Sequence, residues 1–191
     1  MSIETLVKHF KMRDLSGEEV ENLIGKAPVD YASLGKYKNL NELLGKENYC
    51  VVLYDTSSKG VGHYIALTRN EYDGKVRYFD SYGIPNPDVE LQFTPYDEQL
   101  PKYLTKLLEP YDFESNRVDY QSKKSGVSTC GRFASIACMF RNLSLAQIQE
   151  LFKTNKSDFL KDVDNTAVML TMVGLNNIED YLTKIPRGRT F

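Results

Sequence analysis

Residues 49–81 read YCVVLYDTSSKGVGHYIALTRNEYDGKVRYFDS and contain three strand-like runs in succession. The first, at 49–54, is continuously apolar and β-branched, as is typical of a central strand covered on both faces. The runs at 62–68 and 75–81 flank the pair Asp73–Gly74, which suits a tight hairpin turn. Together the three runs predict an antiparallel sheet.

Helical patterns lie on both sides of this stretch. Ser16 and Glu19 form a capping-box pair ahead of an apolar stripe, which predicts a helix over 17–24 that ends at Gly25. Further helices are predicted over 102–110, over 131–140, after the capping pair Ser144 and Gln147, and over 158–173 before Gly174. The run VDYQSK at 118–123 is predicted to be one more strand, so the class is α+β.

Length and charge limit the classes of protein to which this chain can belong. At 191 residues, the chain is expected to form a single domain over 1–191, with a flexible basic tail at 186–191. Its 24 Lys and Arg against 26 Asp and Glu give a net charge of −2, which lacks the basic excess that DNA or RNA attracts. No apolar run approaches the ~20 residues of a membrane span, so no membrane partner is expected.

Cysteine and histidine usage argues against disulfides and metal sites. The N-terminal stretch is charged throughout and has no secretory-signal pattern, so we expect a protein that is not secreted and sees reducing conditions. Cys50, Cys130 and Cys138 are then free thiols. Only His9 and His63 accompany them, with no CxxC or HxxxH spacing, so no metal is expected.

One cysteine, one histidine and one carboxylate lie where elements begin or end. Cys130 lies where a loop passes into a helix, so the N–H groups of the first turn point toward its sulfur and favour a thiolate. His63 opens a strand beside Gly62, and Asp80 ends the following strand. A thiol nucleophile needs a base, and the base needs an acceptor for its second nitrogen. The three residues form a candidate Cys-His-Asp site.

Each candidate also has an ordinary structural interpretation. A lone cysteine is often a small buried hydrophobe, and an aspartate before serine often opens a turn. Cys138 and Cys50 lie in apolar surroundings and are expected in the core, whereas His9 is expected at the surface. Arg132 could bind a substrate acid or form a salt bridge inside the fold.

Four local motifs strengthen the catalytic interpretation. GHY at 62–64, YFDSYG at 78–83, a glutamine, and STCGRF at 128–133 follow one another in this order. The pattern resembles the Cys-His-Asp/Glu clan of cysteine proteases that contains adenain and the SUMO-specific proteases, including its 17-residue spacing from histidine to acid. The resemblance covers about 15–143. APVDYASLGKY and YCVVLYDT resemble the viral branch of virophages, polintons and adenoviruses.

The resemblance implies a role for each matching residue. Cys130 would be the nucleophile, His63 the general base, and Asp80 the acid that orients the base. Gln121 would donate to the oxyanion together with the Cys130 backbone N–H. Substrate-binding positions would be Tyr64, Gly62 and Gly131. The implied fold is papain-like with permuted element order, its sheet packed between helices and the cysteine at the start of a core helix.

Two positions depart from the clan pattern. Tyr64 stands where the clan has tryptophan, so the aromatic roof over the substrate channel would be smaller. This channel implies glycine immediately before the scissile bond. Gln121 precedes Cys130 by nine residues, whereas the clan spacing is about six or seven, so the intervening loop would have to fold back. Asn116 and Gln92 are weaker substitutes for this donor.

The pairing of His63 with Asp80 depends on the hairpin register. A tight turn at Asp73–Gly74 would place Asp80 opposite Leu67, about 13 Å along the strand from its partner. A turn centred between Glu71 and Tyr72 would place Asp80 directly opposite His63. We predict this second register, with Asp73–Gly74 in the second strand or in a bulge.

The resemblance implies a monomeric cysteine endopeptidase, without resident cofactor, that cleaves viral capsid precursor proteins in the virion and the host cell interior. An activating peptide is a partner implied by adenain, whereas the net charge does not support its DNA cofactor. Alternative hypotheses are a deSUMOylating or deubiquitinating protease, a Yop-type acetyltransferase that uses the same triad, and a catalytically silent binding module. Cleavage of capsid precursors, cleavage of ubiquitin-like conjugates, or acetylation of the cysteine would distinguish them.

Overall fold

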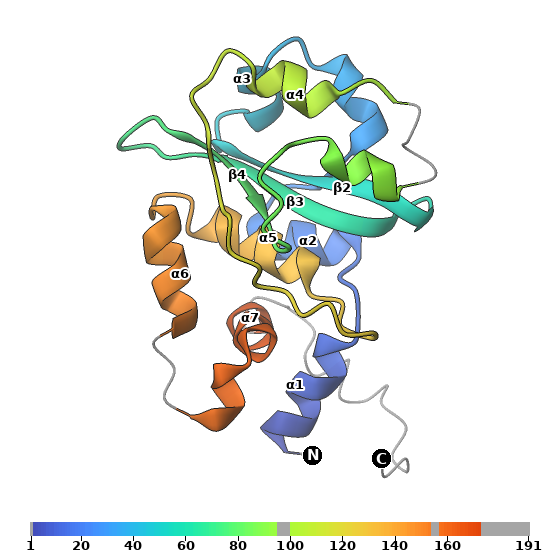
Figure 1. The fold of residues 1–191 in the computed structure, drawn as a ribbon, viewed down its shortest axis with the longest axis vertical. Helices are drawn as coiled ribbons and strands as arrows, with labels where there is room; N and C mark the ends of the chain where they lie inside the picture. Colours follow the sequence, from blue (N-terminus) through green and yellow to red (C-terminus); the bar gives the residue numbers. More distant parts are fainter. Residues whose placement is uncertain (1, 95–99, 154–156, 173–191) are drawn as a thin grey trace.

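The computed structural model describes residues 2–94, 100–153 and 157–172 (Figure 1). Within these ranges, helices surround one mixed sheet, which confirms the predicted α+β class. The strands lie side by side in chain order: β1 (Val29–Asp30), β2 (Tyr49–Ser58), β3 (Val61–Arg69), β4 (Val76–Asp80) and β5 (Glu114–Ser115). The three long strands β2, β3 and β4 are antiparallel, as predicted, whereas the short edge strands β1 and β5 run parallel to their neighbours.

The predicted central strand at 49–54 is confirmed as an interior strand that is covered on both faces, and β3 is its neighbour in the middle of the sheet. These residues lie in β2, between β1 and β3. Helices cover both faces of the sheet, so the interior strands β2 and β3 each contain a long apolar run. The apolar run therefore predicts an interior strand but does not predict its position in the strand order.

Two helical layers enclose the sheet, as expected (Figure 1). Alternate side chains of β2, among them Val52 and Tyr54, face one layer, and Val51 and Leu53 face the other. The first layer contains η1 (Tyr31–Lys36), α3 (Leu40–Leu44) and α4 (Tyr103–Leu108). The second contains α2 (Gly17–Ile24) and α5 (Cys130–Met139), with α6 (Leu145–Lys153) behind them.

The helix α5 carries the candidate nucleophile at its first residue. All its residues from Cys130 to Cys138 are buried. The small residues Gly131, Ala134 and Ala137 let the helix axis approach β3 closely. The start of α5 is therefore held rigidly against the strand that carries His63.

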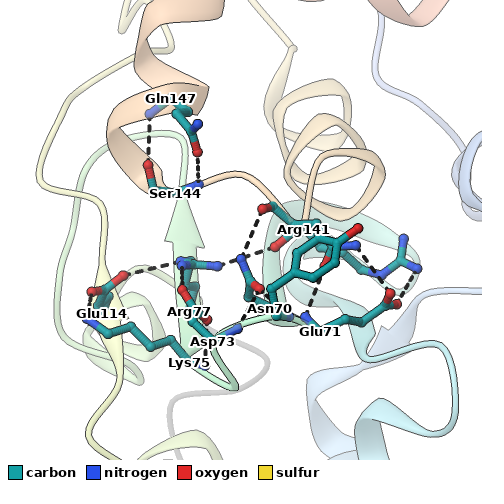
Figure 2. A network of polar contacts seen from close by, with 11 residues as sticks. Asn70, Glu71, Asp73, Lys75, Arg77, Glu114, Arg141, Ser144 and Gln147 are labelled. Carbon is teal, nitrogen blue, oxygen red and sulfur yellow. Dashed lines mark hydrogen bonds and ion pairs between the residues drawn. The ribbon is translucent and has the colours of Figure 1, made fainter.

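The β3–β4 hairpin turns over residues 70–75 (Figure 2). The N–H of Asn70 donates to the Lys75 carbonyl at 3.0 Å, and the N–H of Gly74 donates to the Asn70 carbonyl at 3.0 Å. Oδ1 of Asn70 accepts from the N–H groups of Tyr72 (2.7 Å) and Asp73 (3.1 Å), which replaces hydrogen bonds that a two-residue turn would make between strands. Gly74 has φ +70°, a conformation that glycine adopts without strain.

The hairpin register differs from both arrangements considered for the sequence. Asp80 pairs with Ile65, so the predicted pairing of Asp80 with His63 is wrong, and so is the tight turn at Asp73–Gly74. His63 precedes Ile65 by two residues, which places its side chain on the same face as Asp80 and diagonal to it. A long histidine side chain spans this diagonal, so the triad does not require direct pairing.

A polar network ties the hairpin to the rest of the molecule (Figure 2). The buried Arg77 bridges Asp73 at 3.0 Å and Glu114 of β5 at 3.2 Å, and it donates to the Arg141 carbonyl at 3.3 Å. Arg141 in turn pairs with Glu71 at 2.7 Å. The end of α5 is thus attached to the hairpin tip, which stabilises the loop over 70–75.

Several other elements can be compared with their predictions. The helix α2 has both capping-box hydrogen bonds and ends at Gly25, and α6 begins after the reciprocal Ser144–Gln147 pair, so both predictions are confirmed. The segment 118–123 is no strand; instead, Tyr120 and Gln121 both donate their N–H to the Ser81 carbonyl. The helix predicted over 158–173 is divided into η3 (Asp158–Lys161) and α7 (Val163–Met172).

An additional helix, α1 (Ile3–Lys11), packs against α7. Leu6, Val7 and Phe10 form a small separate core with Val168 and Met172. None of the helices in the described ranges combines the length and apolar character of a membrane span. Gly174 and the predicted tail at 186–191 lie outside the described residues.

Candidate active site

The structure brings together the cysteine, histidine and aspartate that the sequence singled out. Nε2 of His63 lies 3.0 Å from Oδ1 of Asp80, and the thiol of Cys130 interacts with the same imidazole. The sulfur also lies 3.9 Å from the Gly62 carbonyl oxygen. All three side chains are buried, with Asp80 at 0% exposure. The imidazole therefore lies between a thiol and a carboxylate.

Hydrogen bonds to both the backbone and the side chain of Asp80 hold this residue in place. Its N–H donates to Oδ1 of Asn116 at 2.8 Å, and Nδ2 of Asn116 donates back to its carbonyl at 2.6 Å. Oδ1 of Asp80 also accepts the N–H of Tyr82 at 2.8 Å. The short turn after β4 therefore aims this oxygen at His63.

Tyr82 completes the support of the histidine. Its ring stacks on the His63 imidazole, with centroids 4.9 Å apart and planes 20° apart. A stacked ring restricts rotation of the imidazole about its χ2 angle. Tyr82, the second tyrosine of the YFDSYG motif, thus orients the His63 ring from the side, which the sequence did not reveal.

The charged form of His63 is favoured in spite of its burial. Desolvation alone lowers the pKa of this imidazole, but the hydrogen bonds to Asp80 and Cys130 and the charges of both raise it to about 10. Below this pH an imidazolium stands beside the sulfur. Such a group stabilises a thiolate and can donate a proton to a leaving group.

A cavity of about 620 Å³ opens beside the thiol. His63, Cys130 and Tyr82 line it, together with Gly62, Val61 and Thr56 at one end of the β2–β3 pair. Its remaining lining residues are Asp14, Ile84, Glu90, Phe93, Gln121, Lys123, Val127 and Ser128.

Gln121 lies in this cavity wall, as the resemblance requires. Its Oε1 accepts from the Ser81 hydroxyl at 2.8 Å, and its Nε2 donates to the Val127 carbonyl at 3.4 Å. The loop over 122–129 folds back so that both Gln121 and Cys130 line one cavity. Asn116 instead braces Asp80, and Gln92 is exposed outside this cavity, so neither occupies the donor position.

Tyr64 and Gly131 do not face the cavity. Tyr64 is buried in the core beneath α5, on the opposite face of β3 from His63, because successive strand residues alternate. A Cβ at Gly131 would lie 3.1 Å from the Tyr64 ring and 3.3 Å from Leu15. These two residues therefore set the packing distance between α5 and β3, which corrects their expected role as substrate-binding residues.

Gly62 is required by the backbone as well as by the cavity. A Cβ there would lie 1.7 Å from the Tyr54 carbonyl oxygen. The pairing of β2 with β3 shifts between Asp55 and Ser58, and this bulge brings the β2 backbone against Gly62. Only glycine fits at this position beside His63.

The other candidates have structural positions. Cys50 and Cys138 are buried, and burial raises the pKa of the Cys50 thiol to about 12 and that of Cys138 well above its usual value. Arg132 is fully buried and donates to Oγ1 of Thr171 at 2.9 Å, which rules out contact with a substrate acid. His9 is exposed on α1, as expected.

A second carboxyl lies near the site. Donor atoms of His63, Asp80 and Glu90 all lie within 4.8 Å of one another, close enough to contact a single cation. However, Nε2 of His63 is already hydrogen-bonded to Asp80, which is the arrangement of a triad. The expectation of no metal stays a prediction. No sequence signal pointed to Glu90, because it lies ten residues after Asp80 in a segment without a motif.

Comparison with known proteins gives a viral relative and a distant structural neighbour. No family model matches the chain. The uncharacterized protein V9 of Sputnik virophage is 28% identical over 175 residues, which span 87% of this chain and 98% of that protein. The ASFV pS273R protease matches with 15% identity and a TM-score of 0.39 over 73% of this chain. The match spans 56% of that protease, so the chain corresponds to about half of its length.

Proposed function

We propose that this protein is a cysteine protease in which Cys130 is the nucleophile and His63 the general acid and base. The observation that supports this best is the placement of one buried imidazole between the Cys130 thiol and Oδ1 of Asp80 (3.0 Å), at the edge of a cavity. The start of a buried helix adds N–H groups behind the sulfur. A buried structural cysteine would need neither the base nor the cavity.

In the proposed reaction the Cys130 thiolate attacks the carbonyl carbon of a peptide bond. The carbonyl oxygen becomes an oxyanion, which the Cys130 N–H and the Gln121 amide would stabilise. His63 then donates its proton to the leaving amine as the C–N bond breaks. Neutral His63 then takes a proton from a water molecule that attacks the thioester carbon. The C–S bond breaks, the carboxylic acid product leaves, and the Cys130 thiolate and the His63 imidazolium are regenerated.

We infer further that the substrates are virus structural precursors, cleaved inside the virion or the host cell. The near-full-length similarity to a virophage protein supports a viral context. Cleavage after glycine belongs to the same proposal. Because Tyr64 lies in the core, any restriction on side chains would come from Val61, Gly62 and Thr56 at the cavity wall.

The first test compares Cys130→Ala with Cys138→Ala, a buried cysteine two turns later on the same helix. Each variant is co-expressed with capsid precursors of the virus that encodes it, and the products are mapped by mass spectrometry. We expect Cys130→Ala to abolish cleavage and Cys138→Ala to retain it, with iodoacetamide labelling Cys130 fastest in the wild type. Full cleavage by Cys130→Ala would contradict the proposal.

The same preparation distinguishes the alternative activities. Processing of ubiquitin-like conjugates in place of capsid precursors would identify a deconjugating protease. Acetylation of Cys130 by acetyl-CoA, without peptide hydrolysis, would identify an acetyltransferase. A peptide library gives the residue preferred before the scissile bond, and preference for bulky or charged residues there would contradict the glycine proposal.

A further inference from the structure

A buried carboxyl that the triad does not use lies directly behind Asp80. Glu90 belongs to η2 (Val89–Phe93), is 4% exposed, and lines the same cavity as Cys130. Its Oε1 has no hydrogen-bond partner among the described residues, and neither has Oδ2 of Asp80. Donor atoms of the two carboxyls and His63 lie within 4.8 Å of one another. The two carboxyls are thus neighbours, and when both are ionised each has one buried oxygen without a donor.

The backbone holds Glu90 in this place. Asp88, which precedes η2 with φ +66°, accepts the Thr105 N–H at 2.7 Å and the Leu104 N–H at 3.3 Å. It also accepts the Tyr31 hydroxyl at 2.5 Å. These bonds anchor the start of η2 to α4 and η1, and thereby fix the backbone from which the Glu90 side chain projects.

The surroundings of Glu90 favour its neutral form. Burial raises the pKa of its carboxyl, the charge of His63 lowers it, and the charge of Asp80, together with the hydrogen bond that a protonated Glu90 can make to Asp80, raises it further, to about 7. Two adjacent carboxylates in a buried site do not readily ionise together. The groups that face Glu90 are His63 from β3, Asp80 and Tyr78 from β4, and Tyr82 after β4, with Asp14, Lys123 and Cys130 lining the cavity.

We propose that Glu90 is a positioning residue that, as a neutral acid, donates its O–H to Oδ2 of Asp80 and keeps Oδ1 on His63. The donated proton satisfies both orphaned oxygens at once. When Glu90 ionises, the donor to Oδ2 is lost and a second negative charge appears beside Asp80, so the carboxylate is held through Oδ1 alone. This role rests on the proposed protease function, because it acts through the His63–Asp80 pair.

The test measures kcat and KM from pH 5 to 9 for the wild type, Glu90→Gln and Glu90→Met. Glutamine keeps an N–H donor that cannot ionise, whereas methionine fills the space without one. Glu109→Gln, an exposed carboxyl at the end of α4, is the control. Thermal unfolding of each variant shows whether it folds.

We expect wild-type kcat to decline through about pH 7, and Glu90→Gln to keep kcat within about threefold at pH 6 without that decline. Glu90→Met should lose about tenfold in kcat with little change in KM. The proposal would be overturned if Glu90→Gln lost as much as Glu90→Met, which would indicate an ionised Glu90. Equal activity of both variants would also overturn it.

A second measurement separates this proposal from the protease function itself. With ¹³C-labelled glutamate, NMR should show one carboxyl titrating near pH 7 that disappears in Glu90→Gln. The His63 ring ¹⁵N shifts should change through the same pH range. If neither the wild type nor any variant cleaves a substrate, the protease proposal fails. The titration still shows whether Glu90 holds a proton beside Asp80. Titration of Glu90 near the ordinary glutamate pKa of 4.5 would refute the proposed proton donation from Glu90 to Asp80.

Discussion

At the scale of single residues, the site depends on one oxygen of Asp80. Oδ1 accepts both the His63 imidazole and the Tyr82 N–H, while Asn116 holds the backbone of the same residue. In the proposed reaction, this carboxylate would orient the base and stabilise the imidazolium. Its charge is therefore more important for turnover than for the stability of the fold.

Asp80→Asn preserves the volume and the acceptor for Tyr82 but removes the negative charge. We expect turnover to fall by about two to four orders of magnitude, because the imidazolium loses its partner. The thermal unfolding midpoint should change little. Steady-state kinetics and calorimetry on the same preparation check both parts, and unchanged turnover would remove Asp80 from the mechanism.

Glu90 also makes stability depend on pH. The pKa of its carboxyl is raised to about 7 in the folded protein from an ordinary value of 4.5. The folded state thus holds the proton more tightly, so stability is highest below about pH 4.5 and is lost as pH rises through 7. The full shift corresponds to roughly 3 kcal/mol.

We expect Glu90→Gln to abolish this contribution. Its free energy of unfolding should therefore exceed that of the wild type increasingly as pH rises from 5 to 8, because glutamine never ionises. Urea unfolding at a series of pH values measures the difference. Parallel curves for the two proteins would show that Glu90 titrates alike in the folded and unfolded states.

At the scale of elements, the bulge in β2 determines the position of His63 at the start of β3. The register shift between Asp55 and Ser58 brings the Tyr54 carbonyl over Gly62, one residue before the histidine. The same strand pair then supplies Val61 and Thr56 to the cavity wall. Backbone geometry at this end of the sheet is thus part of the site.

Gly62→Ala tests this constraint. The new methyl group would overlap the Tyr54 carbonyl, so the strands must separate, and we expect a loss of about 1–3 kcal/mol in unfolding free energy. Activity should also fall, because His63 moves with the strand. Val61→Ala, at a side chain 45% exposed, is the neighbouring control and should leave stability nearly unchanged. Comparable stability of the two variants would show that the bulge adapts.

At the scale of the whole molecule, Arg132 links the active-site helix to the terminal helices. Its guanidinium donates to Thr171 of α7 at 2.9 Å and to the Phe10 carbonyl of α1 at 3.3 Å. It also lies 5.5 Å from the Phe10 ring centroid, in a cation–π contact. One fully buried side chain therefore holds three helices behind the nucleophile.

Arg132→Ala should destabilise the protein by on the order of 3 kcal/mol or more, because two charge-assisted hydrogen bonds and the packing of a long side chain are lost. Denaturant unfolding measures the loss. Lys153→Ala, which removes an exposed ion pair with Glu150, is the control and should change stability by less than about 1 kcal/mol. A small effect of Arg132→Ala would mean that α1 and α7 pack independently of α5.

The sequence by itself determined several of the local elements and the identity of the candidate triad. Capping pairs and apolar periodicity identified α2, α5 and α6, and the motifs identified Cys130, His63, Asp80 and Gln121. These features depend on neighbouring residues, whose hydrogen bonds and side-chain directions follow from their spacing.

Only the tertiary structure decided how the strands pair and what surrounds the triad. The sequence did not predict the diagonal pairing of His63 with Asp80, the burial of Tyr64, or the carboxyl of Glu90 beside Asp80. Loop hydrogen bonds made by Asn70 outweighed the turn preference of Asp73–Gly74 and set the register. Such arrangements depend on packing and hydrogen bonds between segments distant in the chain, and local propensity does not encode them.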